Sequence, residues 1–128
     1  MWTNAHIPCP LSLQLYRDPR TYFAFIVGND RYPAPPPAPG TTAPPRVAKC
    51  GVDAADIRTA LVAQGYLPGN IVFLRDATRD DMIDEFRLFA RRLDGAVGCT
   101  VVVYYAGHAV EASGSNVLLP IDANLAGW

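Results

Sequence analysis

The stretch CTVVVYYAGH, at residues 99–108, is the most apolar run of the chain and decides how the rest of the sequence is interpreted. Its apolar residues do not alternate with polar ones, a pattern typical of a strand that is covered on both faces. We therefore predict a central strand of a parallel sheet over Cys99–Tyr105. Gly107 and His108 would then lie at its carboxyl end.

Further strands are predicted on both sides of this run. Thr21–Val27 and Ile71–Leu74 are rich in β-branched and aromatic residues and are followed by breaks in the apolar pattern. Asn116–Pro120 resembles them and is predicted as a fourth strand.

Two helices are predicted between these strands. Asp53–Gln64 has an apolar face and is followed by Gly65, whereas the second helix begins at Thr78, with Asp81 in the position of a capping box, and ends at Gly95. The apolar stripes comprise Ala54, Ile57 and Leu61 in the first helix, and Met82, Phe86, Phe89 and Leu93 in the second. Because helical connections imply parallel strands, the fold class is α/β: an open, mainly parallel sheet with helices on both faces.

The regions outside this pattern are predicted to lack regular structure. Residues 1–20 are expected to be a flexible leader and residues 124–128 a tail. A proline-rich segment at 33–45 cannot form a helix or a central strand, and we expect an exposed loop inserted into a single domain.

Composition excludes several classes of function. A net charge of −1 with mixed signs does not favour nucleic acid or a membrane surface, and no apolar stretch is long enough to span a bilayer. No pattern of ligands predicts a metal site, and no residue implies a cofactor. Without a signal peptide, reduced thiols in the cytoplasm are expected for the three cysteines, Cys9, Cys50 and Cys99.

The predicted topology gathers polar residues at one edge of the sheet. In an open parallel sheet, active sites lie at the carboxyl ends of the strands. His108 is the outstanding residue there, since the pKa of an imidazole suits proton transfer near neutrality, although position alone leaves a structural role equally open. The segments expected to meet at this edge are 28–30, Asp76, Gly107–His108 and the loop with Cys50 and Asp53.

Four segments carry a resemblance to a known family. VVVYYAGH at 101–108 resembles the histidine strand of caspase-like peptidases, including metacaspases, and FIVGNDRY at 25–32 is similar to their first strand and turn. KCGVDA at 49–54 resembles the metacaspase segment that opens the first helix, and LLPIDA at 118–123 resembles the strand after the histidine loop. The resemblance implies an incomplete caspase-like three-layer α/β/α domain at 21–123, acting on peptide or protein substrates.

The resemblance also implies roles for individual residues. His108 would be the base of a Cys–His dyad, and the backbone at Gly107 would help to hold the tetrahedral intermediate. Asp53 would belong to the primary specificity pocket and favour Arg or Lys before the scissile bond, with Cys50 beside it. An equally weighted alternative makes Asp53 the N-cap of its helix, with Asp56 at the third helical position.

The sequence departs from the family's pattern in three places. Ala109 and Val52 replace a glycine and an asparagine of the family, and a positive φ at Ala109 would be strained. No cysteine follows His108, so the chain is expected to be inactive alone. The strand at 116–120 would then have an open edge, which is expected to pair with a companion small subunit or a C-terminal segment.

The other cysteines are poor substitutes for the missing nucleophile. Cys99 begins the strand that His108 follows, which puts the two roughly 20 Å or more apart. Cys50 lies near a helix N-terminus, which lowers a thiol pKa, but the resemblance places it beside the pocket instead of in the nucleophile's loop.

Two other classes of function remain as alternatives. A non-catalytic caspase-like module could bind partners through its open sheet edge. A nucleotide-binding, receiver or serine-hydrolase domain is less favoured, because the sequence has no phosphate-binding glycine motif and no serine elbow, and Lys49 is in the wrong place to complete a site with Asp30 and Asp76.

Overall fold

The computed structural model describes residues 18–33, 39–40 and 49–124. Most of the leader, the proline-rich loop and the tail that the sequence predicts lie outside the described residues.

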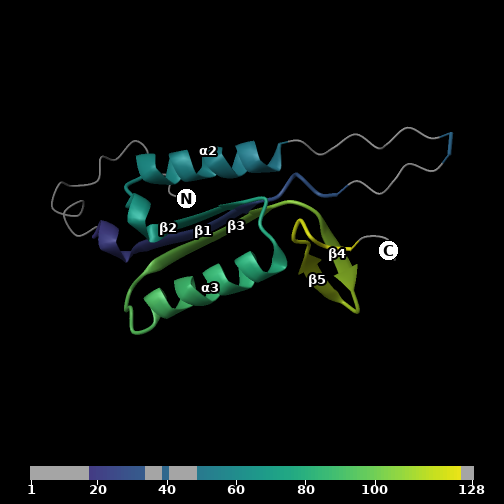
Figure 1. The fold of residues 1–128 in the computed structure, drawn as a ribbon. Coiled ribbons are helices and arrows are strands. Elements are labelled where there is room, and N and C mark those ends of the chain that lie inside the picture. Colours follow the sequence, from purple (N-terminus) through teal and green to yellow (C-terminus); the bar gives the residue numbers. More distant parts are fainter. Residues whose placement is uncertain (1–17, 34–38, 41–48, 125–128) are drawn as a thin grey trace.

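A parallel sheet forms the middle layer of the domain. Its strands are β1 (Tyr22–Gly28), β2 (Ile71–Arg75) and β3 (Thr100–Ala106), in the spatial order β2-β1-β3. Helix α2 (Cys50–Ala63) covers one face and α3 (Arg79–Leu93) lies on the other (Figure 1). The open α/β fold class with helices on both faces is therefore confirmed.

The hydrophobic core is built around β1, whose side chains are buried on both faces. Ala24 and Ile26 pack toward α2, against Ala54. Phe25 packs toward α3, where its ring contacts those of Phe86 and Phe89. Burying a side chain of this size contributes about 1.5–3 kcal/mol, so β1 holds the two outer layers together.

The prediction that residues 99–105 form the central strand is wrong, because β1 occupies that place. β3 pairs with β1 on one side only, and its other side is an edge of the described sheet. Val101 and Val103 face the side of α3 but remain 39% and 61% exposed. Among the described β3 residues on that face, Tyr105 packs against the buried core.

The predicted fourth strand at 116–120 does not join this sheet. Instead, β4 (Ala109–Ala112) and β5 (Ser115–Leu118) form an antiparallel hairpin beyond the ends of the parallel strands (Figure 1). The reason is the turn, in which Ser113 and Gly114 both have positive φ, at 52° and 79°. This left-handed pair folds the chain directly back on itself, so β5 pairs with β4.

The helix starts are capped in two different ways. Thr78 and Asp81 form the predicted capping box at the start of α3. The N-cap prediction for Asp53, with Asp56 as the third helical residue, is wrong because α2 already begins at Cys50. A carboxylate from the loop after β1 supplies the cap, since Asp30 Oδ2 accepts the N–H of Gly51 at 3.1 Å.

Two short 3-10 helices complete the described structure. Helix η2 (Pro19–Thr21) precedes β1, and η3 (Pro68–Asn70) leads into β2. Both begin with a proline, whose fixed φ suits the first helical position.

A methyl group at Gly28 is expected to destabilise the fold. A Cβ there would lie 2.6 Å from the Cys50 carbonyl oxygen and 2.7 Å from the Ala54 Cβ, so α2 would have to move away from β1. Gly28→Ala should lower the free energy of unfolding by about 1–3 kcal/mol, the usual cost of overpacking, as measured by urea denaturation. The control is Gly69→Ala in η3, where a Cβ meets no atom within 4 Å. Equal stability of the two variants would contradict the prediction.

Candidate active site

The loops after the three parallel strands are joined by backbone hydrogen bonds. The N–H of Asp76 donates to the carbonyl of Gly28 at 3.0 Å, and the N–H of Asn29 donates to that of Ala106 at 2.8 Å. The segments expected at this edge therefore do meet. The fully buried side chain of Asn29 completes the junction by accepting the N–H of Ala77 at 2.9 Å.

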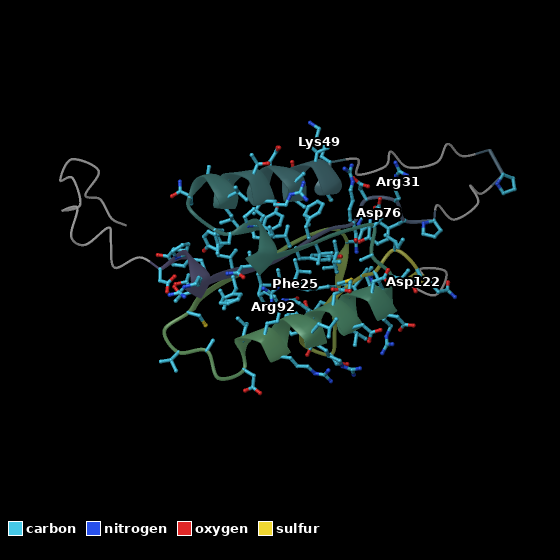
Figure 2. The ribbon with its side chains drawn as sticks, turned by 60° about the vertical axis from the view of Figure 1, so that its left-hand side comes forward. Phe25, Arg31, Lys49, Asp76, Arg92 and Asp122 are labelled. Carbon is cyan, nitrogen blue, oxygen red and sulfur yellow. The ribbon has the colours of Figure 1, made fainter. Side chains whose placement is uncertain are left out.

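Asp76 organises the turn that follows β1. Its Oδ1 accepts the backbone N–H groups of Asp30 and Arg31, both at 3.1 Å, and Arg31 Nε lies 3.7 Å from Oδ2. Burial opposes ionisation of Asp76, but these donors outweigh it and lower the pKa of the carboxyl group. Figure 2 shows Arg31 and Asp76 at the same end of the molecule as Lys49, which precedes α2.

His108 lies directly beyond β3, with its backbone fixed and its side chain exposed. Its N–H donates to the Tyr32 hydroxyl at 3.0 Å, and its carbonyl accepts the Tyr105 hydroxyl at 2.7 Å and the N–H of Leu119 at 2.9 Å. The imidazole contacts the Tyr32 ring, but its nitrogens form no hydrogen bond within the described residues. The histidine is therefore anchored through its main chain and remains accessible to a substrate.

The two tyrosine hydroxyls beside His108 lie 3.0 Å apart and also converge on the Leu119 carbonyl. Tyr32 donates to that carbonyl at 2.7 Å, and the Tyr105 hydroxyl lies 2.8 Å from it. Burial, reinforced by the neighbouring Tyr32 hydroxyl, raises the pKa of Tyr105. The sequence analysis missed Tyr32, although its place just after the FIVGND turn was a usable signal.

Gly107 is required for close approach of these hydroxyls. A Cβ at this position would lie 2.6 Å from the hydroxyl oxygens of both Tyr105 and Tyr32. Gly107 has no positive φ, so the requirement for glycine comes from the lack of space beside these hydroxyls and not from the backbone conformation. Ala109 has none either and lies within β4, so its Cβ causes no strain there.

Cys50 and Asp53 lie in the first turn of α2, on the same edge of the sheet as His108. Asp53 is exposed and Cys50 is half-buried. Burial raises the pKa of the Cys50 thiol, and the charges of Asp30 and Asp53 raise it further. The net pKa of this thiol is therefore raised, whereas the sequence predicted that the helix N-terminus would lower it. Cys50 also has no hydrogen bond to His108 in the described part of the chain, which argues against it as a surrogate nucleophile.

The described ranges contain neither a cluster of metal ligands nor a membrane-spanning helix. No three His, Cys, Asp or Glu side chains among them gather as metal ligands would. Neither described α-helix is long and apolar enough to cross a bilayer.

The fold and the site define a class of protein: an α/β domain with an accessible histidine at the carboxyl end of a parallel strand, where active sites of open sheets lie. Comparison with protein families extends this result, because the model of the caspase domain, a peptidase family, matches residues 21–127. The chain belongs to the caspase domain family. No curated protein matched it.

The thiol of Cys50 should react slowly with alkylating agents. Burial and the charges of Asp30 and Asp53 raise its pKa above the ordinary value of a thiol, and only the thiolate form reacts with these agents. Asp53→Asn removes one of the charges that raise this pKa and should accelerate iodoacetamide labelling of the Cys50 peptide, followed by mass spectrometry. Asp56→Asn, an exposed change on the same helix, is the control and should have no effect. Equal rates in both variants would show that Asp53 does not act on Cys50.

Stability should fall at high pH because of Tyr105. Its pKa is higher in the folded protein than the ordinary value of 10.0, so the folded state holds this proton more tightly. The resulting stabilisation is fully present below pH 10 and is lost as the pH rises above it. Urea denaturation from pH 8 to 11 should show this decline, and Tyr105→Phe should reduce its slope. Tyr104→Phe, on the opposite face of β3, should leave the slope unchanged; an unchanged slope in Tyr105→Phe would contradict the assignment.

Proposed function

We propose that this chain is the histidine-bearing part of a cysteine endopeptidase, in which His108 is the base of a Cys–His dyad. The observation that carries this proposal is an exposed imidazole on a backbone held at both its N–H and its carbonyl. His108 would take the proton of the cysteine thiol, and the thiolate would attack the scissile carbonyl carbon. The imidazolium would then protonate the leaving amine, and water would hydrolyse the thioester. The backbone N–H of Gly107 would help to hold the oxyanion.

We propose that the nucleophile comes from a segment outside this sequence. The chain has no cysteine after His108, Cys99 lies at the far end of β3, and burial and nearby carboxylates raise the pKa of the Cys50 thiol. A companion subunit or a C-terminal segment would supply the cysteine.

The outer side of β3, which is an edge of the described sheet, is the proposed docking edge, in place of the strand at 116–120. A parallel strand added there would lie about 4.8 Å from β3. Its carboxyl end would be adjacent to His108, which is where a nucleophile is needed. The exposed side chains of Val101 and Val103, with Phe86 on the same face, give the added segment an apolar surface to cover.

We also propose a preference for Arg or Lys before the scissile bond. The carboxylates of Asp30 and Asp53 both raise the pKa of the Cys50 thiol, so two acidic groups lie near the start of α2. A guanidinium or ammonium group of a substrate would be attracted there, with the exposed Asp53 as its partner and Cys50 beside it. The chain itself would act in the cytoplasm.

A second candidate function is a non-catalytic module that binds a partner through β3. The observation that favours it is the exposure of Val103, at 61%, beside a strand edge that pairs with no other strand among the described residues. In this case His108 would have no chemical role.

The test is reconstitution of activity with the polypeptide encoded directly downstream of this chain. The mixture should cleave fluorogenic peptides after Arg or Lys and not after Asp. His108→Ala should reduce kcat about 10²–10⁴-fold, the usual contribution of a general base. Asp53→Asn should raise KM for these substrates, whereas the control Asp56→Asn should not.

Each other outcome has a definite meaning. Full activity of His108→Ala would reject the dyad, and cleavage after Asp would reject the basic preference. Binding of the downstream polypeptide without cleavage by any mixture would favour the non-catalytic module.

A further inference from the structure

We propose that Tyr32 is a positioning residue that fixes both the backbone and the ring of His108. The inference rests on the proposed function of His108 as a base. Tyr32 comes from the loop after β1, a different part of the chain from the strand that carries the histidine. It would not touch the substrate, and its effect would be exerted through His108 alone.

The first part of this role is a hydrogen bond to the main chain. The N–H of His108 donates to the Tyr32 hydroxyl at 3.0 Å, while the carbonyl on the other side of the residue is held by Tyr105 and Leu119. With both backbone groups anchored, the Cα–Cβ bond of His108 has a fixed direction. Tyr32 supplies the anchor on the amino side.

The second part is packing against the imidazole. The two ring centroids are 4.5 Å apart with an angle of 55° between the planes. Tyr32 is only 8% exposed, so it forms a fixed wall on one side of a side chain that is otherwise open to solvent. Such a wall restricts the rotamers of His108 without using either ring nitrogen.

The hydrogen-bond inventory explains why a phenol is needed here. A hydroxyl has one proton to donate and lone pairs that accept. Tyr32 can accept from the N–H of His108 while it donates to the Leu119 carbonyl at 2.7 Å, and this leaves the proton of Tyr105 for the His108 carbonyl. A phenylalanine would keep the wall but leave that N–H and the Leu119 carbonyl each with one partner fewer.

The chain is well suited to a spectroscopic test, because it has only two histidines, His6 and His108. In a His6→Ala background, the side-chain NMR signals of histidine come from His108 alone. Hydrogen exchange of the His108 amide reports the backbone anchor, and the ring proton signals report the imidazole. The amide of Ile26, in the centre of β1, reports the stability of the whole fold.

Tyr32→Phe should accelerate exchange of the His108 amide by about two- to tenfold, which corresponds to the loss of one net hydrogen bond. Exchange at Ile26 should be unchanged, and the ring signals of His108 should broaden or split. The control is Tyr104→Phe, which removes a hydroxyl that makes no hydrogen bond within the described residues and should change none of these signals. In the unmodified chain, nuclear Overhauser effects should connect the rings of Tyr32 and His108.

Three results would overturn the proposal. The first is an unchanged exchange rate of the His108 amide in Tyr32→Phe, and the second is equal acceleration of exchange at His108 and Ile26. The third is the absence of Overhauser effects between the rings of Tyr32 and His108 in the chain without a substitution at Tyr32. In the reconstituted peptidase, Tyr32→Phe should lower kcat with KM unchanged, since the hydroxyl does not contact the substrate. Failure of the proposed function would leave these NMR results unaffected, so the two inferences can fail separately.

Discussion

The carbonyl group of Leu119 is the acceptor on which the geometry of the site depends. Tyr32 donates its hydroxyl proton to this carbonyl at 2.7 Å, the buried Asn29 amide lies at 3.4 Å, and the Tyr105 hydroxyl lies 2.8 Å away. These groups come from the loop after β1 and from β3, whereas Leu119 itself follows the hairpin. One buried carbonyl thus draws three separate segments together beside His108, and a donor lost there would leave polar groups unpaired in the interior.

This junction works because the sheet beneath it is rigid. β1 is buried on both faces, and the absence of a side chain at Gly28 lets α2 lie directly against its carboxyl end. That contact brings the start of α2 close enough for Asp30 to cap it. The same close approach half-buries Cys50 near the carboxylates of Asp30 and Asp53, so the packing that builds this edge also raises the pKa of its thiol.

The parts of the fold that follow from local pattern could be predicted from the sequence, and the parts set by tertiary contacts could not. Strand and helix positions and the capping box at Thr78 depend on residues that are neighbours in the chain. The cap of α2 could not be found in this way, because Asp30 lies 21 residues before Gly51. Tyr32 escaped notice for the same reason, since its partners are 76 and 87 residues away.

The prediction of β3 as the central strand failed for a different reason, and that reason bears on function. Its run of valines and tyrosines is the pattern of a strand covered on both sides, yet Val103 is 61% exposed. Apolar strand residues are usually buried, so an apolar strand face that stays exposed indicates a surface with a role beyond the fold. The exposed flank is adjacent to the strand that ends at His108, so whatever covers it would also lie beside the imidazole. The apolar composition of β3 therefore supports a docked segment at the place where a dyad would need its cysteine.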